Sequence, residues 1–147
     1  MKFYIASDHA GFELKNKILE NFKDIIDIGP FEFVKEDDYP DFVYKLVTQM
    51  KKDLENSKGI LVCMNGGGVS IASNKFKGIR SAIAMSDEHV QTLISDDNIN
   101  IVSLGANFLS TEEAIKIVKS YLELNFEPEE RHLRRLSKLS IIENSNL

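Results

Sequence analysis

The chain has 147 residues, of which 43% are hydrophobic, a size typical of one compact domain with a single core. Its net charge of -5 and pI near 5.2 exclude an extended nucleic-acid surface, which needs clustered Lys and Arg. Cys63 is the only cysteine, which excludes an intrachain disulfide, and without an apolar run of about 18 residues we expect a cytoplasmic protein with no membrane span.

Short apolar runs alternate with amphipathic stretches along the chain. The runs predict strands over residues 3–6, 25–28, 59–63, 80–84 and 100–104. Helical spacing of apolar residues predicts helices over 11–22, 41–54, 69–76, 87–95, 111–122 and 128–142. This alternation favours an α/β fold with a parallel sheet covered on both faces, and it places functional residues in the loops that follow the strands.

Asp8 and His9 directly follow the first predicted strand, where the first helix begins. The positive end of a helix attracts anions, so the pair is a candidate anion site. Alternatively, Asp8 caps the helix and His9 is a solvated loop residue. The two residues alone do not decide between these interpretations.

The most informative segment follows the third predicted strand and reads Cys63-Met64-Asn65-Gly66-Gly67-Gly68-Val69-Ser70. Three consecutive glycines allow a tight turn whose N–H groups converge on an oxyanion or phosphate. The Gly-Lys-Ser/Thr of a Walker A loop is absent. Cys63 is a candidate base or nucleophile at the mouth of this loop, although an inert buried cysteine is an equally good interpretation.

Arg131 and Arg135 are four residues apart in the last predicted helix, so they project from one face and could hold a phosphate together. A solvated basic face paired with Glu129 and Glu130 is the alternative. Leucines at helical intervals on the same helix need a covering surface, which indicates a packing arm. His89 is interpreted as a surface residue, and no metal-ligand spacing is present.

Taken together, these residues resemble the ribose-5-phosphate isomerase B family, which also contains the subunits of galactose-6-phosphate isomerase. The resemblance runs nearly end to end. It rests on the segments 6–11 (Ala-Ser-Asp-His-Ala-Gly), 38–41 (Asp-Tyr-Pro-Asp), Cys63 with its glycine loop, 71–76 (Ile-Ala-Ser-Asn-Lys-Phe), 78–80 (Gly-Ile-Arg) and 131–132 (Arg-His).

The resemblance implies a Rossmann-like three-layer fold with a five-stranded parallel sheet, and a C-terminal helix that packs on a neighbouring subunit of a homodimer or homotetramer. It also implies an aldose–ketose isomerase whose active sites lie at the subunit interface and which uses no metal or organic cofactor. Cys63 would move the proton through an enediolate, and the loop amides would hold the oxyanion. The substrate-binding residues implied or predicted are Asp8, His9, Tyr39, Gly66, Gly67, Gly68, Ser70, Asp97, Arg131 and Arg135.

Four residues in three segments of the site depart from the family pattern. Asp96 stands where the ring-opening histidine is expected, and a carboxylate is a poor proton donor near neutral pH unless it is buried. Asp97 replaces an asparagine and adds negative charge near an anionic substrate. Asn65 replaces a Thr or Ser that contacts the sugar, and Asn107 replaces an arginine that often contacts the phosphate.

The leading hypothesis is a sugar-phosphate isomerase that interconverts ribose 5-phosphate and ribulose 5-phosphate or a related pentose or hexose phosphate. The second is a sugar-phosphate-binding subunit of a hetero-oligomeric isomerase that has lost turnover, as Asp96 and Asp97 would allow. A flavodoxin-like or response-regulator domain shares the alternation of strands and helices, but it has no role for Cys63, the glycine loop or the two arginines.

Overall fold

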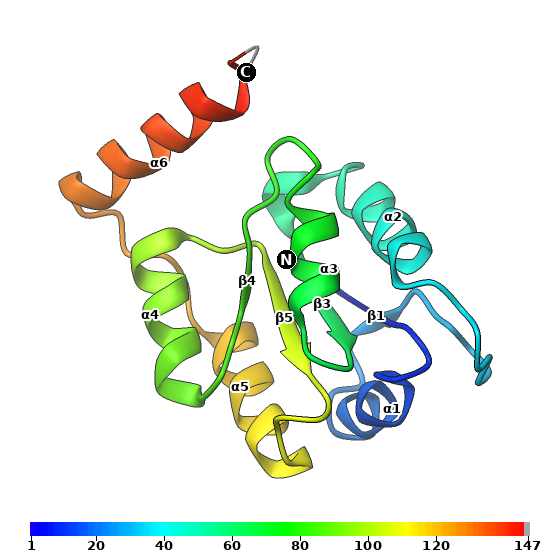
Figure 1. Ribbon diagram of the computed structural model, residues 1–147. Coiled ribbons are helices and arrows are strands. Elements are labelled where there is room, and N and C mark those ends of the chain that lie inside the picture. Colours follow the sequence, from blue (N-terminus) through cyan, green and yellow to red (C-terminus); the bar gives the residue numbers. More distant parts are fainter. Residues whose placement is uncertain (146–147) are drawn as a thin grey trace.

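The computed structural model describes residues 1–145, and strands and helices alternate along that range (Figure 1). The strands are β1 (Lys2–Ser7), β2 (Ile26–Asp27), β3 (Ser57–Cys63), β4 (Ser81–Ile83) and β5 (Ile101–Gly105). The helices are α1 (Phe12–Asn21), α2 (Tyr39–Met50), α3 (Gly67–Ser73), α4 (Asp87–Asp97), α5 (Thr111–Glu123) and α6 (Glu130–Glu143), with a 3-10 turn, η1 (Leu54–Asn56), before β3.

The five strands form one parallel sheet in the order β2-β1-β3-β5-β4, which confirms the predicted α/β fold. β3 is central and every one of its residues is buried, as expected for a strand covered on both faces. The chain leaves β1 toward one side of the sheet and leaves β3 toward the other. The crevice between the carboxyl ends of β1 and β3 is therefore a topological switch point, the usual ligand position in open α/β sheets.

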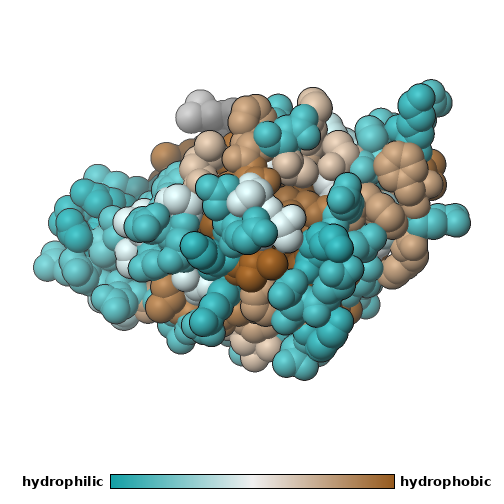
Figure 2. All heavy atoms as spheres, turned by 90° about the horizontal axis from the view of Figure 1, so that it is seen from below, coloured by the Kyte–Doolittle hydropathy of each residue, from teal (hydrophilic) through white to brown (hydrophobic). Residues whose placement is uncertain are grey.

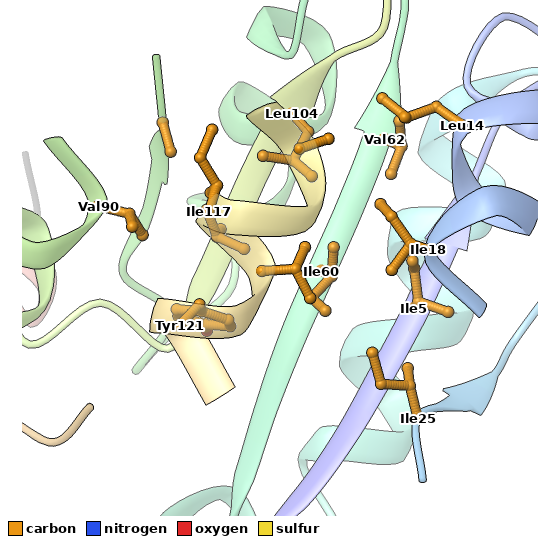
Figure 3. Packing of buried hydrophobic residues seen from close by; sticks show 14 of the residues in the cluster. Ile5, Leu14, Ile18, Ile25, Ile60, Val62, Val90, Leu104, Ile117 and Tyr121 are labelled. Carbon is orange, nitrogen blue, oxygen red and sulfur yellow. The ribbon is translucent and has the colours of Figure 1, made fainter. Parts of the chain in front are cut away.

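Alternate residues of the strands supply two cores. On one face, Ile5, Ile60 and Val62 pack with side chains of α1, α4 and α5, including Ile18 and Tyr121 (Figure 3). On the other face, residues of β1 and β3 pack against α2 and α3; they are Tyr4, Ala6, Leu61 and Cys63. Because side chains alternate along a strand, Cys63 faces the α2 and α3 layer.

The last helix, α6, stands away from the sheet at the end opposite to the strand tips (Figure 1). Its first turn contacts the end of α4, and Glu143 at its other end accepts a hydrogen bond from the Gly78 backbone N–H (2.6 Å). Between these two attachments, Leu133 and Leu139 are 50% and 49% exposed. The leucine stripe seen in the sequence is thus left half uncovered within this chain.

Several predicted boundaries differ from the structure by one or more residues. The helix predicted over 41–54 ends at Met50, because Leu54 belongs to the separate turn η1. The helix predicted over 69–76 begins at Gly67, since two of the glycines adopt helical geometry. The predicted 128–142 helix begins only at Glu130, so Pro128 lies outside it. Within residues 1–145, no helix is both long enough and apolar enough to cross a membrane.

Candidate active site

The loop after β3 has a geometry that only its glycines permit. Gly66 has a φ of 78°, in the left-handed region that disfavours other residues. A Cβ on Gly105, in the neighbouring strand, would lie 2.9 Å from the Asn65 carbonyl carbon, so the loop backbone also packs closely on β5. These contacts fix the loop at the carboxyl edge of the sheet.

Cys63 ends β3 with its side chain turned into this loop. The Gly66 N–H donates to Cys63 Sγ (3.2 Å), and Asn65 Oδ1 lies 4.0 Å from the same sulfur. Asn65 Oδ1 also accepts the Gly67 N–H (2.9 Å). The residue is 4% exposed, so its sulfur is held by one backbone donor and shielded from bulk water.

The first turn of α3 leaves two N–H donors available. The Gly66 and Gly67 N–H groups are used by Sγ and by Asn65, and the Ser70 N–H donates to the Gly66 carbonyl. The N–H groups of Gly68 and Val69 have no hydrogen-bond acceptor within residues 1–145. Free N–H groups at a helix start are suited to a negatively charged oxygen.

Asp8 and His9 lie in the loop after β1, beside the β3 end. The Asp8 N–H donates to the Val62 carbonyl (3.3 Å), which ties the two strand ends together. Asp8 Oδ1 accepts the Gly11 N–H (3.0 Å), so the capping interaction considered for Asp8 forms one residue ahead of α1. Asp8 is 7% exposed, and burial raises the pKa of its carboxyl group above the ordinary value.

His9 is not a free loop residue. Its Nδ1 lies 2.7 Å from Asp37 Oδ1, and its backbone N–H donates to the same oxygen (2.8 Å). The Asp37 carboxylate raises the pKa of His9 above the ordinary value, while burial acts in the opposite direction. A positively charged imidazole at the start of α1 favours an anionic ligand.

Tyr39 completes this group from the start of α2. Its ring packs directly on the glycine loop, because a Cβ on Gly68 would lie 2.8 Å from Tyr39 Cζ. The side chains of Asp8, His9, Tyr39 and Cys63 thus come from three successive loops at one edge of the sheet. Figure 2 views this edge of the molecule: an apolar area lies near its middle and hydrophilic side chains surround it.

Ser70 is hydrogen-bonded to β4. Its hydroxyl donates to the Ser81 carbonyl (3.3 Å) and so faces β4. Ser70, which was predicted to bind the substrate, therefore links α3 to the sheet within this chain.

The remaining predicted site residues lie at the opposite edge of the sheet. Asp96 and Asp97 end α4, which runs back from the carboxyl edge to the amino edge, and Arg131 and Arg135 are exposed on α6 beyond that edge (Figure 1). Arg131 Nε donates to Glu129 Oε2 (2.9 Å), the exposed pairing that was the alternative for this residue. One chain therefore carries two separated groups of candidate residues.

His132 connects α6 to the end of α4. Its side chain is buried, with Nδ1 3.3 Å from the Glu127 carbonyl and Nε2 3.7 Å from Asp96 Oδ1. The Asp96 side chain is 45% exposed, so within one chain it lacks the burial that would make a carboxyl group a good proton donor.

A cleft of about 490 Å³ separates α6 from the body of the protein. Arg80, Ala82, Asp97, Leu136 and Leu139 are among its lining residues, and Cys63 is not. Within residues 1–145, no cluster of three or more His, Cys, Asp or Glu side chains is arranged to hold a metal ion. The groups available for chemistry are a thiol, carboxyl groups, an imidazole and backbone N–H donors.

Residues 3–139 match the family model described as Ribose/Galactose Isomerase. The match covers most of the chain. The chain belongs to this family.

Relatives and solved structures within the ribose/galactose isomerase family agree with the match. A probable ribose-5-phosphate isomerase B of Mycoplasma genitalium is 40% identical over 92% of this chain and 91% of its own length. The crystal structure of ribose-5-phosphate isomerase B from that organism, with bound ribulose-5-phosphate, superposes with a TM-score of 0.93 at 38% identity and covers 99% of this chain and 97% of its own. The enzyme from Clostridium thermocellum gives a TM-score of 0.89 at 35% identity, with 97% of each chain covered.

Two features of the site were missed from the sequence. Asp37 was not identified as the partner of His9, because it lies 28 residues away in an irregular segment with no periodicity. The proximity of His132 to Asp96 was missed because the packing of α6 against α4 has no local pattern. Both Asp–His pairs join segments that are distant in the sequence, so they can be recognised only in the folded chain.

Proposed function

We propose that this chain is an aldose–ketose isomerase that interconverts ribose 5-phosphate and ribulose 5-phosphate through an enediolate, with one isomerase domain spanning residues 1–147. The observation that carries the proposal is the position of Cys63 at the switch point of the sheet, where its sulfur accepts the Gly66 N–H of the glycine loop on which Tyr39 packs. The names of the relatives, and the ribulose-5-phosphate bound to one of them, support this substrate class.

In the proposed reaction, the Cys63 thiolate removes the proton from C2 of the open-chain aldose phosphate. The C1 carbonyl oxygen gains the negative charge, and the free N–H groups of Gly68 and Val69 in the loop are available to stabilise it. The thiol returns the proton to C1, while the O2 hydroxyl proton is transferred to O1. No electron acceptor is needed, since one carbon is oxidised as its neighbour is reduced.

The other residues at this edge would position the sugar. Asp8 and Tyr39 belong to the loops next to that of Cys63 and are suited to bind sugar hydroxyls, while His9 is placed at the start of α1 to contact the phosphate. In the same proposal Gly66, Gly67 and Asn65 shape the loop around Cys63 through their hydrogen bonds. Ser70 holds α3 against β4.

We place the second group of residues in the active site of another copy of this chain. Arg131 and Arg135 would reach the phosphate bound beside Cys63 of a partner, as part of a homodimer or homotetramer. Apolar side chains exposed near the strand tips support a contact there: Met64, Met85 and Phe108 are 52%, 56% and 66% exposed. The uncovered leucines of α6 provide the complementary apolar surface.

Asp96, brought along by the partner, would be the group that protonates the ring oxygen when the sugar opens. Burial at the subunit contact would favour its protonated form, and His132 lies beside it. Asp97, at the same helix end, would then face the sugar. Its negative charge is less unfavourable there than beside the phosphate. We also assign the protein to the cytoplasm, because a reducing compartment keeps Cys63 free.

The test is solvent exchange. In deuterium oxide, NMR would follow deuterium incorporation at C2 of ribose 5-phosphate and C1 of ribulose 5-phosphate, with hexose 6-phosphates for comparison and Cys63→Ala as the control. Exchange that disappears in the variant supports the proposal. Binding of ribose 5-phosphate without any exchange would instead support the sugar-phosphate-binding subunit.

A further inference from the structure

Asp37 binds His9 through a single oxygen. Its Oδ1 accepts the His9 backbone N–H (2.8 Å) and lies 2.7 Å from His9 Nδ1. The Asp37 side chain is 9% exposed and that of His9 is 37% exposed, so the carboxylate holds the ring from the inner side. The other ring nitrogen, Nε2, has no hydrogen-bond partner in the described part of the chain.

The segment that carries Asp37 is itself held in place. Lys15 Nζ donates to the Pro30 carbonyl (2.9 Å) at its beginning. Phe33 packs edge-on against the rings of both His9 (centroids 6.4 Å apart) and Phe12 (6.1 Å). The carboxylate therefore approaches His9 from a supported loop.

The hydrogen-bonding chemistry restricts the protonation state of the ring. An ionised carboxylate only accepts hydrogen bonds, so Nδ1 must carry a proton. In the neutral ring Nε2 is then an acceptor and cannot donate to a phosphate oxygen. Only the imidazolium form can donate to Asp37 and to a phosphate at once.

We propose that Asp37 is a positioning residue for His9, which fixes its ring orientation and couples its binding of the substrate phosphate to the imidazolium form. The proposal rests on the proposed function, in which the ligand is a sugar phosphate. Asp37 itself touches no substrate and acts through His9.

The charges around His9 agree with this role. Asp37 faces the ring from the loop before α2, and Asp8 lies beside it at the end of β1. Asp37, by its hydrogen bond, and Asp8, by its charge, both raise the pKa of His9, against an opposing effect of burial. Both carboxylates therefore favour the cationic ring, which is the form that can donate to Asp37 and to a phosphate at once.

The matched variants are Asp37→Asn, which keeps a hydrogen-bond acceptor but loses the charge, and Glu36→Gln, which loses an equal charge from the neighbouring exposed residue. NMR titration of the imidazole groups gives the pKa of His9, assigned with His9→Gln. We expect Asp37→Asn to lower that pKa and Glu36→Gln to leave it near the wild-type value.

Kinetics with ribose 5-phosphate add a second readout. Above pH 7 we expect Asp37→Asn to raise KM by about five- to tenfold, the difference between a charged and a neutral hydrogen bond, with little change in kcat. As the pH falls below the ordinary imidazole pKa of about 6.5, the ring becomes protonated in both proteins and the KM values should converge. In the His9→Gln background, adding Asp37→Asn should change KM no further.

An unchanged His9 pKa in Asp37→Asn, a KM effect independent of pH, or additive effects in the double variant would each overturn the proposal. Failure of the proposed function is recognised separately, because the NMR titration needs no turnover. If the wild type isomerises nothing, the difference in His9 pKa between the ligand-free wild type and Asp37→Asn still decides the role of Asp37. Thermal unfolding at pH 6 verifies that each variant is folded.

Discussion

Gly68 and Tyr39 are in direct contact, and the three atoms nearest to a Cβ built on Gly68 all belong to the Tyr39 ring, at 2.8 to 3.1 Å. The glycine loop and the start of α2 therefore share one surface. A change at either residue is transmitted to the other, and through it to the space beside Cys63.

We predict that Gly68→Ala displaces the Tyr39 ring and raises KM for ribose 5-phosphate by at least about tenfold, because misplaced contacts weaken a bound geometry strongly. The melting temperature should change little, since a ring at the end of a flexible side chain can move. In a Tyr39→Ala background, Gly68→Ala should have no further effect on KM. A large additional effect would show that the methyl group disturbs the loop itself.

The two separated groups of residues predict complementation. Cys63→Ala and Arg135→Ala should each be nearly inactive, since loss of a general base alone costs about 10²- to 10⁴-fold. If the site is shared in a two-fold dimer, half of the randomly mixed dimers are mixed and half of their sites are intact, so activity recovers to about a quarter of wild type. A mixture as inactive as its components would place Arg135 outside the partner's site.

The buried carboxyl group of Asp8 predicts a cost in stability when it is ionised. Its folded pKa is raised above the unfolded value by burial, so ionising it opposes folding. Asp8→Asn retains an acceptor for the Gly11 N–H and removes the charge. The variant should therefore melt at a higher temperature than wild type at pH 7 to 8.

The sign of the Asp8 effect can be checked by pH. The advantage of Asp8→Asn should shrink as pH falls through the folded pKa and vanish below the unfolded pKa of about 3.9. Thermal unfolding of both proteins between these limits measures it. Equal melting temperatures at every pH would mean that the Asp8 charge is well solvated in the folded protein.

Lys15 predicts a large loss of stability away from the site. Its fully buried Nζ donates to Asp27 Oδ2 (2.7 Å) and to the Pro30 carbonyl. Lys15→Met should lower the free energy of unfolding by about 3 kcal/mol, because it leaves the buried Pro30 carbonyl and the partly buried Asp27 carboxylate unpaired. Lys17→Met, which removes an exposed pair with Glu20, should cost about 0.5 kcal/mol or less in the same denaturant titration.

Much of the fold could be predicted from local patterns. Each predicted strand overlaps an observed one, because short apolar runs between amphipathic helices are what a buried parallel sheet requires. The family resemblance is confirmed by the comparisons, and it rested on contiguous motifs such as the glycine loop at Cys63. Local signals were sufficient wherever one segment carries its own structure.

Relations between distant segments could not be predicted. Nothing near Lys15 indicates that it is buried, since its partners come from residues 27 and 30. The Asp37–His9 pair depends on the path of an irregular loop, and the separation of Arg131 and Arg135 from Cys63 depends on the direction in which α6 leaves the sheet. These are properties of the assembled chain, and no single window of sequence contains them.

The central position of β3 has a consequence for how the protein emerges from the ribosome. Cys63 pairs with Gly105, and its carbonyl oxygen accepts the Ala106 N–H (2.9 Å), so the loop rests on residues made more than forty positions later. Until β5 is synthesised, β3 has a neighbour on one side only, and its apolar open edge is exposed. Cys63 can therefore be set in place only late in synthesis, and the nascent chain is most vulnerable to misassembly while residues 64–105 are being added.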